Sequence, residues 1–295
     1  MKERTLQNIV LVGMVSASAV VAACGNNSGS KVETAAEPVG VATAGVSETI
    51  PVTPPATPEP VRVVVDRQTA TAAWKDGVQS FDNGDYVTAS DKLKTAVAGK
   101  PGDSYALYLL GLAQWKSGDL AGAESSLVES VQLDDTRVKG WINLARVRNQ
   151  RDDRSGALEA ADKALTLTPG SSDAMHQKGR ALMELNRGDE ALTVLTAAAE
   201  LDPANGYVAN SLGLLLIQLG RPADAVSPLE AAKTALPHVP YVRNNLGVAY
   251  ERIGRLADAK IEYLAAVEAG DADGKAMKSL TRLGATDTTV TALSE

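Results

Sequence analysis

Apolar residues between about residues 70 and 273 recur in six blocks of 34 residues. Each block carries a small residue at the same place, namely Gly77, Gly111, Ala145, Gly179, Gly213 and Gly247. An alanine follows each of them twelve residues later, at Ala89, Ala123, Ala157, Ala191, Ala225 and Ala259. Four residues further on, most blocks have a larger apolar side chain, at Leu93, Leu127, Leu195, Leu229 and Tyr263, whereas the third block has Ala161. A period kept without a slip predicts a tandem array.

Turn residues such as Gly118-Asp119 and Gly254-Arg255 split the apolar period of each block into two short helical segments. Proline closes four of the blocks, at Pro101, Pro169, Pro203 and Pro237. Asp135 and Asp271 take that place in the second and sixth blocks, where an acidic side chain can cap the helix that follows. The pattern therefore predicts one helical hairpin per block.

The fixed small residues have a physical explanation in close helix packing. Glycine inside a helix costs about 1 kcal/mol relative to alanine, so tight approach of the two helices of a hairpin must offset it. A single hairpin cannot bury its apolar stripe, whereas stacked hairpins share one continuous core. The repeats should therefore be stable only as an array.

The segment Tyr241–Tyr250, followed by Gly254, Ala259, Tyr263 and Ala266, resembles the tetratricopeptide repeat motif. The resemblance covers about residues 70–273 and implies an all-α, right-handed superhelix, an α-solenoid, of six helical hairpins. The third repeat departs most, with Ala145 for the motif glycine and Asp152 at the turn glycine. Beyond the repeats, Lys275–Leu283 is amphipathic and predicts a C-terminal capping helix. The predicted domain is thus 66–284, followed by a flexible tail over 285–295.

Lys2 and Arg4 precede an apolar stretch, Ile9–Ala23, that ends in Val21-Ala22-Ala23-Cys24. This arrangement resembles the lipobox of bacterial lipoproteins, which implies removal of residues 1–23 as a signal peptide and acylation of Cys24. The stretch is too short to favour a transmembrane helix, although an uncleaved signal anchor is the alternative. Cys24 is the chain's single cysteine, so it cannot form an internal disulfide. Gly25 and Asn26 follow it, in place of the aspartate that marks inner-membrane retention in bacterial lipoproteins, so the resemblance implies an outer-membrane lipoprotein facing the periplasm rather than an inner-membrane one.

Residues 24–65 are rich in Ser, Thr, Ala, Val and Pro, with five prolines between Pro51 and Pro60. This composition predicts a disordered tether that starts at the lipidated cysteine. Its span is roughly 35 Å as a coil and on the order of 120 Å in extended polyproline form. The array can thus work well away from the membrane that holds it.

Composition and motifs narrow the function classes. The net charge of −7 makes nucleic acid an unfavourable partner, and we expect none. The sequence has two histidines, His176 and His238, and no HExxH, phosphate-binding glycine loop or GxSxG motif. We therefore predict no catalytic residue, no metal site and no cofactor, and keep an enzyme as the alternative of a different class.

In tetratricopeptide arrays the first helices of successive repeats line a concave groove. By this resemblance, the residues predicted to line it are Asn143, Arg146, His176, Arg180, Tyr207, Asn210, Tyr241, Asn244 and Asn245. Asparagine can donate to and accept from a peptide backbone, and tyrosine adds apolar area with a polar tip, which suits an extended segment. The alternative is that these residues are repeat consensus and only satisfy neighbouring helices.

Aromatic residues gather in the first two repeats of a chain that is only 4% aromatic. They are Trp74, Phe81, Tyr105, Tyr108 and Trp115. About half of them should be core, and the rest are expected to form an apolar docking patch.

Together these features predict a membrane-anchored periplasmic adaptor that binds a protein or peptide segment and reaches the membrane through its N-terminal lipid. Six repeats behind a lipobox resemble the pilotins of type IV pili, which would make a secretin the partner. A scaffold that recruits peptidoglycan hydrolases or other envelope enzymes is the alternative.

Overall fold

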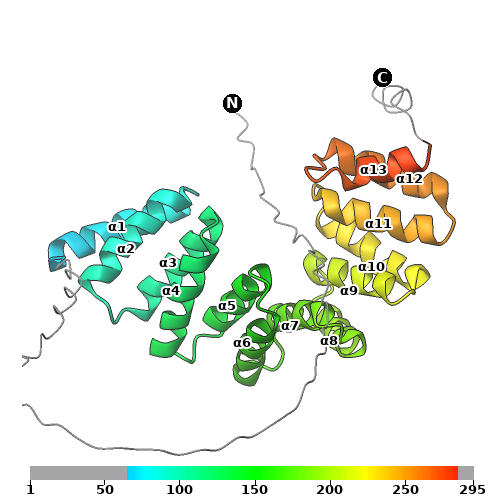
Figure 1. The fold of residues 1–295 in the computed structure, drawn as a ribbon. Coiled ribbons are helices and arrows are strands. Elements are labelled where there is room, and N and C mark those ends of the chain that lie inside the picture. Colours follow the sequence, from blue (N-terminus) through cyan, green and yellow to red (C-terminus); the bar gives the residue numbers. More distant parts are fainter. Residues whose placement is uncertain (1–64, 285–295) are drawn as a thin grey trace, which may run out of the picture. The chain divides into compact units, whose positions relative to one another are not determined.

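The computed structural model describes residues 65–284, which form thirteen α-helices and no strand (Figure 1). The helices are α1 (Arg67–Asp82), α2 (Tyr86–Gly99), α3 (Ser104–Ser117), α4 (Leu120–Leu133), α5 (Val138–Gln150), α6 (Arg154–Leu167), α7 (Ser172–Glu184), α8 (Gly188–Leu201), α9 (Gly206–Gln218), α10 (Pro222–Ala235), α11 (Pro240–Arg252), α12 (Leu256–Glu268) and α13 (Lys275–Arg282). The predicted six hairpins and terminal helix are confirmed, and the fold is an all-α repeat solenoid. Cys24, the signal-like stretch, the tether up to residue 64 and the tail from residue 285 lie outside the described residues.

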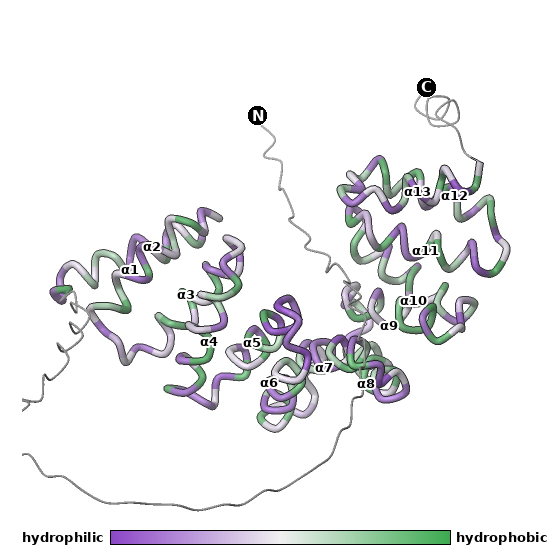
Figure 2. Tube along the Cα trace, in the orientation of Figure 1, coloured by the Kyte–Doolittle hydropathy of each residue, from purple (hydrophilic) through white to green (hydrophobic). Residues whose placement is uncertain are grey.

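Each odd-numbered helix from α1 to α11 pairs with the even-numbered helix that follows it, and each one from α1 to α9 also contacts the next odd-numbered helix. The even-numbered helices make no comparable contact with one another among the described residues. The odd-numbered helices are therefore closer together and form what we call the inner face. Hydrophobic and hydrophilic stretches alternate along the helices, as an amphipathic array requires (Figure 2).

The small residue of each repeat lies where the two helices of a hairpin cross. A Cβ atom on Gly213 would lie 2.4 Å from Cγ of Leu229, and one on Gly247 would lie 2.6 Å from Cε1 of Tyr263. The third repeat solves the same problem differently, because Ala145 is followed by Ala161 and both are fully buried. The methyl group that an alanine adds at the crossing is accommodated because its partner lacks the leucine branches.

Acidic caps begin many of the helices. The carboxylate of Asp271 accepts hydrogen bonds from the backbone N–H groups of Ala276 (2.8 Å) and Met277 (3.2 Å), so the predicted cap of α13 is confirmed. The corresponding prediction for Asp135 is wrong, since α5 begins after Arg137 and has no side-chain cap. Asp135 instead accepts a hydrogen bond from the Trp141 indole through its backbone carbonyl.

The hairpin turns use the left-handed backbone conformation. Gly84, Gly118, Gly220 and Gly254 have positive φ and recur in the repeat register, and Asp152 and Asn186 occupy the third and fourth places with φ of 65° and 58°. Aspartate and asparagine tolerate this conformation better than other non-glycine residues. The departure at Asp152 therefore leaves the turn intact.

No helix within residues 65–284 is long and apolar enough to cross a bilayer.

Candidate functional site

A ladder of side-chain hydrogen bonds joins consecutive helices of the inner face. Four of its bonds connect residues 35 positions apart, one repeat plus one residue: Trp115 to Gln150 (2.7 Å), Asn143 to Tyr108 (3.2 Å), His176 to Ser211 (2.9 Å) and Asn245 to Asn210 (3.0 Å). They link α3 to α5, α7 to α9, and α9 to α11. The Asn149 amide also donates to the Gln177 backbone carbonyl, from α5 to α7, at 3.0 Å. The ladder thus runs from the second repeat to the sixth.

Four of the predicted groove residues belong to this ladder: Asn143, His176, Asn210 and Asn245. Three of them are buried, and burial lowers the pKa of His176 to about 3, helped by the positive charges of Arg180 and Arg146. His176 is therefore neutral at physiological pH and bonds a serine of the next repeat. For these four residues the structure shows the alternative role, in which their polar groups satisfy neighbouring helices.

Three of the remaining groove residues have polar atoms without a hydrogen-bond partner among the described residues. The side chain of Tyr207 is 52% exposed, and Tyr241 in the same register of the next repeat is half-buried. Burial, together with Tyr207, raises the pKa of Tyr241 to about 12, so its hydroxyl stays protonated. Asn244 is 9% exposed, and its Oδ1 accepts no hydrogen bond. A buried amide oxygen without a donor is costly, and a bound N–H group would relieve that cost.

The two groove arginines lie in the third and fourth repeats, at equivalent places on α5 and α7. Arg146 donates to Oδ1 of Asn143 at 2.9 Å, and its guanidinium lies 5.1 Å from the centre of the Trp115 ring. Arg180 makes no hydrogen bond or ion pair with another described residue. Burial lowers the pKa of both arginines, and for Arg180 the positive charge of Arg146 adds to the effect. Both guanidinium groups remain available to a ligand on the inner face.

The structure does not gather the five aromatic residues into one exposed patch. Trp74, Tyr105 and Tyr108 form a chain of rings with centroid distances of 5.8 and 6.1 Å, whereas Phe81 packs against Tyr86 within its own hairpin. Tyr108 is buried in the core, and the indole of Trp115 is part of the ladder. Tyr105, at 45%, is the most exposed of the five.

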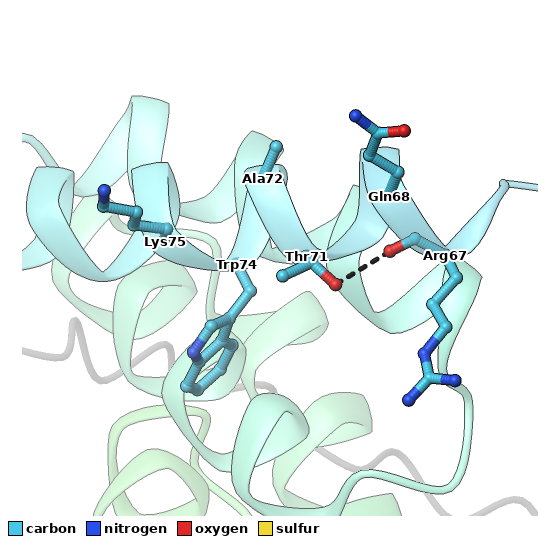
Figure 3. Close-up of a pocket in the computed structure, with 6 residues that line it drawn as sticks. All are labelled: Arg67, Gln68, Thr71, Ala72, Trp74 and Lys75. Carbon is cyan, nitrogen blue, oxygen red and sulfur yellow. Dashed lines mark hydrogen bonds between the residues drawn. The ribbon is translucent and has the colours of Figure 1, made fainter.

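One pocket lies beside this aromatic chain, on the first helix. It is lined by Arg67, Gln68, Thr71, Ala72, Trp74 and Lys75, all from α1 (Figure 3). Trp74 projects from the opposite side of α1 to Ala72 and Gln68, and the Thr71 hydroxyl bonds the Arg67 carbonyl at 2.8 Å. The pocket is open, and its lining comes from this single helix.

Sequence reasoning missed residues that share the register of the groove tyrosines. Lys139 and Asp173 stand in the 34-residue register of Tyr207 and Tyr241, and both are exposed. The register itself would have identified them. The ladder partners Gln150, Ser211 and Gln177 were missed for another reason, since their bonds span 35, 35 and 28 positions, and neither offset is part of the motif. Residues 65–284 contain no cluster of three or more metal-ligating side chains.

A solenoid of stacked helical hairpins is the architecture of the helical repeat proteins. Two protein-family models, both described as tetratricopeptide repeat, match this chain. One matches residues 81–137 and 176–240, and the other matches residues 240–269. Together they span about half of the chain. The chain therefore belongs to the tetratricopeptide repeat family, whose repeats mediate protein–protein interaction.

Solved structures with the same fold include Pseudomonas aeruginosa PilF, with a TM-score of 0.55 and 23% identity over 62% of this chain and 85% of PilF. A crystal structure of MamA gives a TM-score of 0.51 at 22% identity, covering 58% of this chain and 93% of that one. MamA from Desulfovibrio magneticus gives 0.52 at 17% identity, covering 57% and 94%. At these identities the likeness shows the fold alone.

A curated relative is cellulose synthase operon protein C of Pseudomonas fluorescens, 28% identical over 117 residues. The match covers 40% of this chain but only 9% of that protein. The two proteins therefore share a few repeats, not a whole architecture.

Proposed function

We propose that the protein is an adaptor that binds an extended segment of a partner protein along its inner face, at the third to sixth repeats. The observation that carries the proposal is a set of groups there that have no partner among residues 65–284: the half-buried guanidinium of Arg180, the Oδ1 of Asn244 and the exposed side chain of Tyr207. An extended peptide offers an N–H donor, a carbonyl or carboxylate acceptor and apolar side chains, which are the complements of these three groups. The structure supports binding and offers no constellation for catalysis among the described residues.

The proposal includes a lipid anchor. Cys24 ends a lipobox-like sequence, and about 40 residues separate it from α1. As a lipoprotein, the chain would hold its repeats in the periplasm on a tether, and we favour the outer membrane. A Cys24→Ser variant is expected to keep residues 1–23 and to lose palmitate labelling. Labelling of the variant as strong as that of the wild type would contradict this anchor.

Within this adaptor class, our sharper proposal is a pilotin, a lipoprotein that assists assembly of a pilus secretin. Its support is architectural, because six repeats follow a lipid-attachment motif, and PilF shares the repeat fold. A deletion strain should then lose assembled secretin and twitching motility. The long proline-rich tether favours the second candidate, a scaffold for peptidoglycan hydrolases or other envelope enzymes. That candidate predicts altered cell shape or detergent sensitivity with intact pili.

Affinity capture from solubilised envelopes tests the binding face. The full chain and a Tyr207→Ala/Tyr241→Ala variant serve as baits, and a Val87→Ala variant serves as the control because Val87 is 64% exposed on the even-numbered helix α2. Partners should be retained by the wild type and the control and lost from the tyrosine variant. Circular dichroism checks that all three baits are equally helical. Equal retention by all three would place binding away from the inner face.

A further inference from the structure

Arginine residues in the described part of the chain are usually neutralised by a carboxylate. Examples are Arg148 with Glu124 at 3.0 Å and Arg282 with Glu251 at 2.7 Å. Arg146 and Arg180 are exceptions, since neither has a carboxylate oxygen of residues 65–284 within 4.0 Å although both are half-buried. The other two unpaired arginines of the described part, Arg67 and Arg252, are exposed to water. The inner face thus holds the half-buried, unpaired guanidinium groups.

Such an arrangement is unfavourable for folding alone. A charge that loses water without gaining a counter-charge is destabilising. Within the described part of the chain, the neutral Oδ1 of Asn143 is the one hydrogen-bond acceptor of Arg146. Asp173 and Glu184 are carboxylates that act on Arg146 and Arg180, but both lie beyond ion-pair distance. Glu184 is also shared with Arg154, 3.7 Å away. The positive charge is therefore only partly compensated within the protein.

A third cation extends the same surface. Lys139 is exposed on α5, in the register that Tyr207 and Tyr241 occupy two and three repeats later, and it has no ion pair among the described residues. The inner face of the third and fourth repeats thus presents three cations without an ion pair among the described residues, Lys139, Arg146 and Arg180, against the exposed carboxylates of Asp173 and Glu184. This local excess contrasts with the net charge of −7 of the whole chain.

We propose that the segment bound on the inner face is acidic, and that its carboxylate groups pair with Arg146 and Arg180 while Tyr207 and Tyr241 contact the residues beside them. This inference rests on the proposed adaptor function and specifies the chemistry of the partner. Guanidinium groups bind carboxylates through two parallel hydrogen bonds, which gives both energy and direction. Because the two arginines are already partly desolvated in the free protein, ligand binding removes little additional water from them.

Fluorescence anisotropy tests the proposal with the full chain in detergent. The probes are a short labelled peptide in which glutamate alternates with serine and its counterpart with glutamine in place of glutamate. The wild type should bind the glutamate peptide about tenfold more tightly, and Arg146→Gln and Arg180→Gln should each weaken it by about tenfold. Arg252→Gln is the matched control, because it removes the same charge from an exposed, unpaired site. Its affinity should equal that of the wild type.

Failure of the glutamate peptide to bind, equal affinity for both peptides, or an Arg252→Gln loss as large as that of Arg180→Gln would overturn the proposal. Capture of the natural partner separates this failure from failure of the adaptor function. A partner retained by Arg180→Gln but lost from the Tyr207/Tyr241 variant would leave the adaptor standing and refute its acidic ligand. A partner retained by both variants would refute the adaptor face itself.

Thermal unfolding of Arg180→Met without any peptide gives an independent readout. If Arg180 is kept for a ligand, replacing it by an apolar residue of similar length removes an unpaired charge, and the melting temperature should rise by about 2–4 °C. A fall of the same size would show that Arg180 serves the fold, and would overturn its assignment to a ligand.

Discussion

Substitution of Gly213 by alanine tests the account of the hairpin crossing. The new Cβ would lie 2.4, 2.8 and 3.1 Å from three carbon atoms of Leu229, a side chain with no exposed surface. Overpacking of this kind costs about 1–3 kcal/mol, whereas replacing glycine within a helix gains about 1 kcal/mol. Because two of the three distances are below 3.0 Å and the third is also tight, we expect a net loss of about 1–2 kcal/mol in unfolding free energy.

The third repeat supplies the compensating change. Leu229→Ala alone should cost about 2–5 kcal/mol through lost burial and a cavity. The double variant Gly213→Ala/Leu229→Ala recreates the pair found at Ala145 and Ala161, so its cost should be smaller than the sum of the single costs by about 1–3 kcal/mol.

Urea unfolding followed by circular dichroism measures these free energies, with the transition slope compared among variants because repeat arrays can unfold in parts. Gly170→Ala is the control, since Gly170 lies in a turn with no atom within 4 Å of an added Cβ. A Gly213→Ala variant as stable as the wild type, or a double variant whose cost equals the sum of the singles, would refute the reasoning.

Two further predictions concern buried polar groups. The pKa of His176 in the folded protein is about 3, below its ordinary value, so between pH 6.5 and pH 3 the unfolded chain binds a proton that the folded protein does not. The free energy of unfolding should therefore fall by a few kcal/mol as the pH is lowered from 6.5 to 3. His176→Gln should remove that part of the pH dependence from the unfolding curves. Equal slopes for both proteins would contradict the buried neutral imidazole. Glu262 is buried between Lys233 (2.8 Å) and Arg243 (3.2 Å) and bridges two repeats, so Glu262→Gln should lower the unfolding free energy by about 2 kcal/mol. The control Glu268→Gln, on the exposed side of α12, should change it by less than about 0.5 kcal/mol. Similar urea midpoints for the two variants would argue against the bridge.

The fold could be predicted because it follows from local rules repeated along the chain. The small residues, the turn residues and the prolines that end the helices each act within one hairpin. The same pattern recurs every 34 residues, so six separate segments predict the same hairpin. In the sequence, Ala145 in place of glycine and Ala161 in place of a larger apolar residue are two separate differences from the other repeats. Their meaning as a compensating pair requires knowing that the two residues meet at the crossing.

The candidate site could be predicted only in part. The register placed the residues on the odd-numbered helices, but it did not tell which of them bond the neighbouring repeat. Asn244 and Asn245 are adjacent in sequence, yet Asn245 bonds Asn210 while the Asn244 oxygen has no partner. Likewise, acidic residues lie near Arg180 in the sequence. Whether one of their carboxylate oxygens comes within 4.0 Å of the guanidinium depends on side-chain conformations, which residue spacing does not determine.

Photocrosslinking in cells tests the central claim most directly, that the inner face binds the partner. A photoreactive phenylalanine analogue would replace Tyr207, 52% exposed on the inner face, and in a second strain Ile261, 61% exposed on the even-numbered helix α12. The account predicts one crosslinked partner at position 207 that is absent at position 261 and is weakened by Arg180→Gln. The same partner crosslinked equally from both positions, or at position 261 alone, would contradict it.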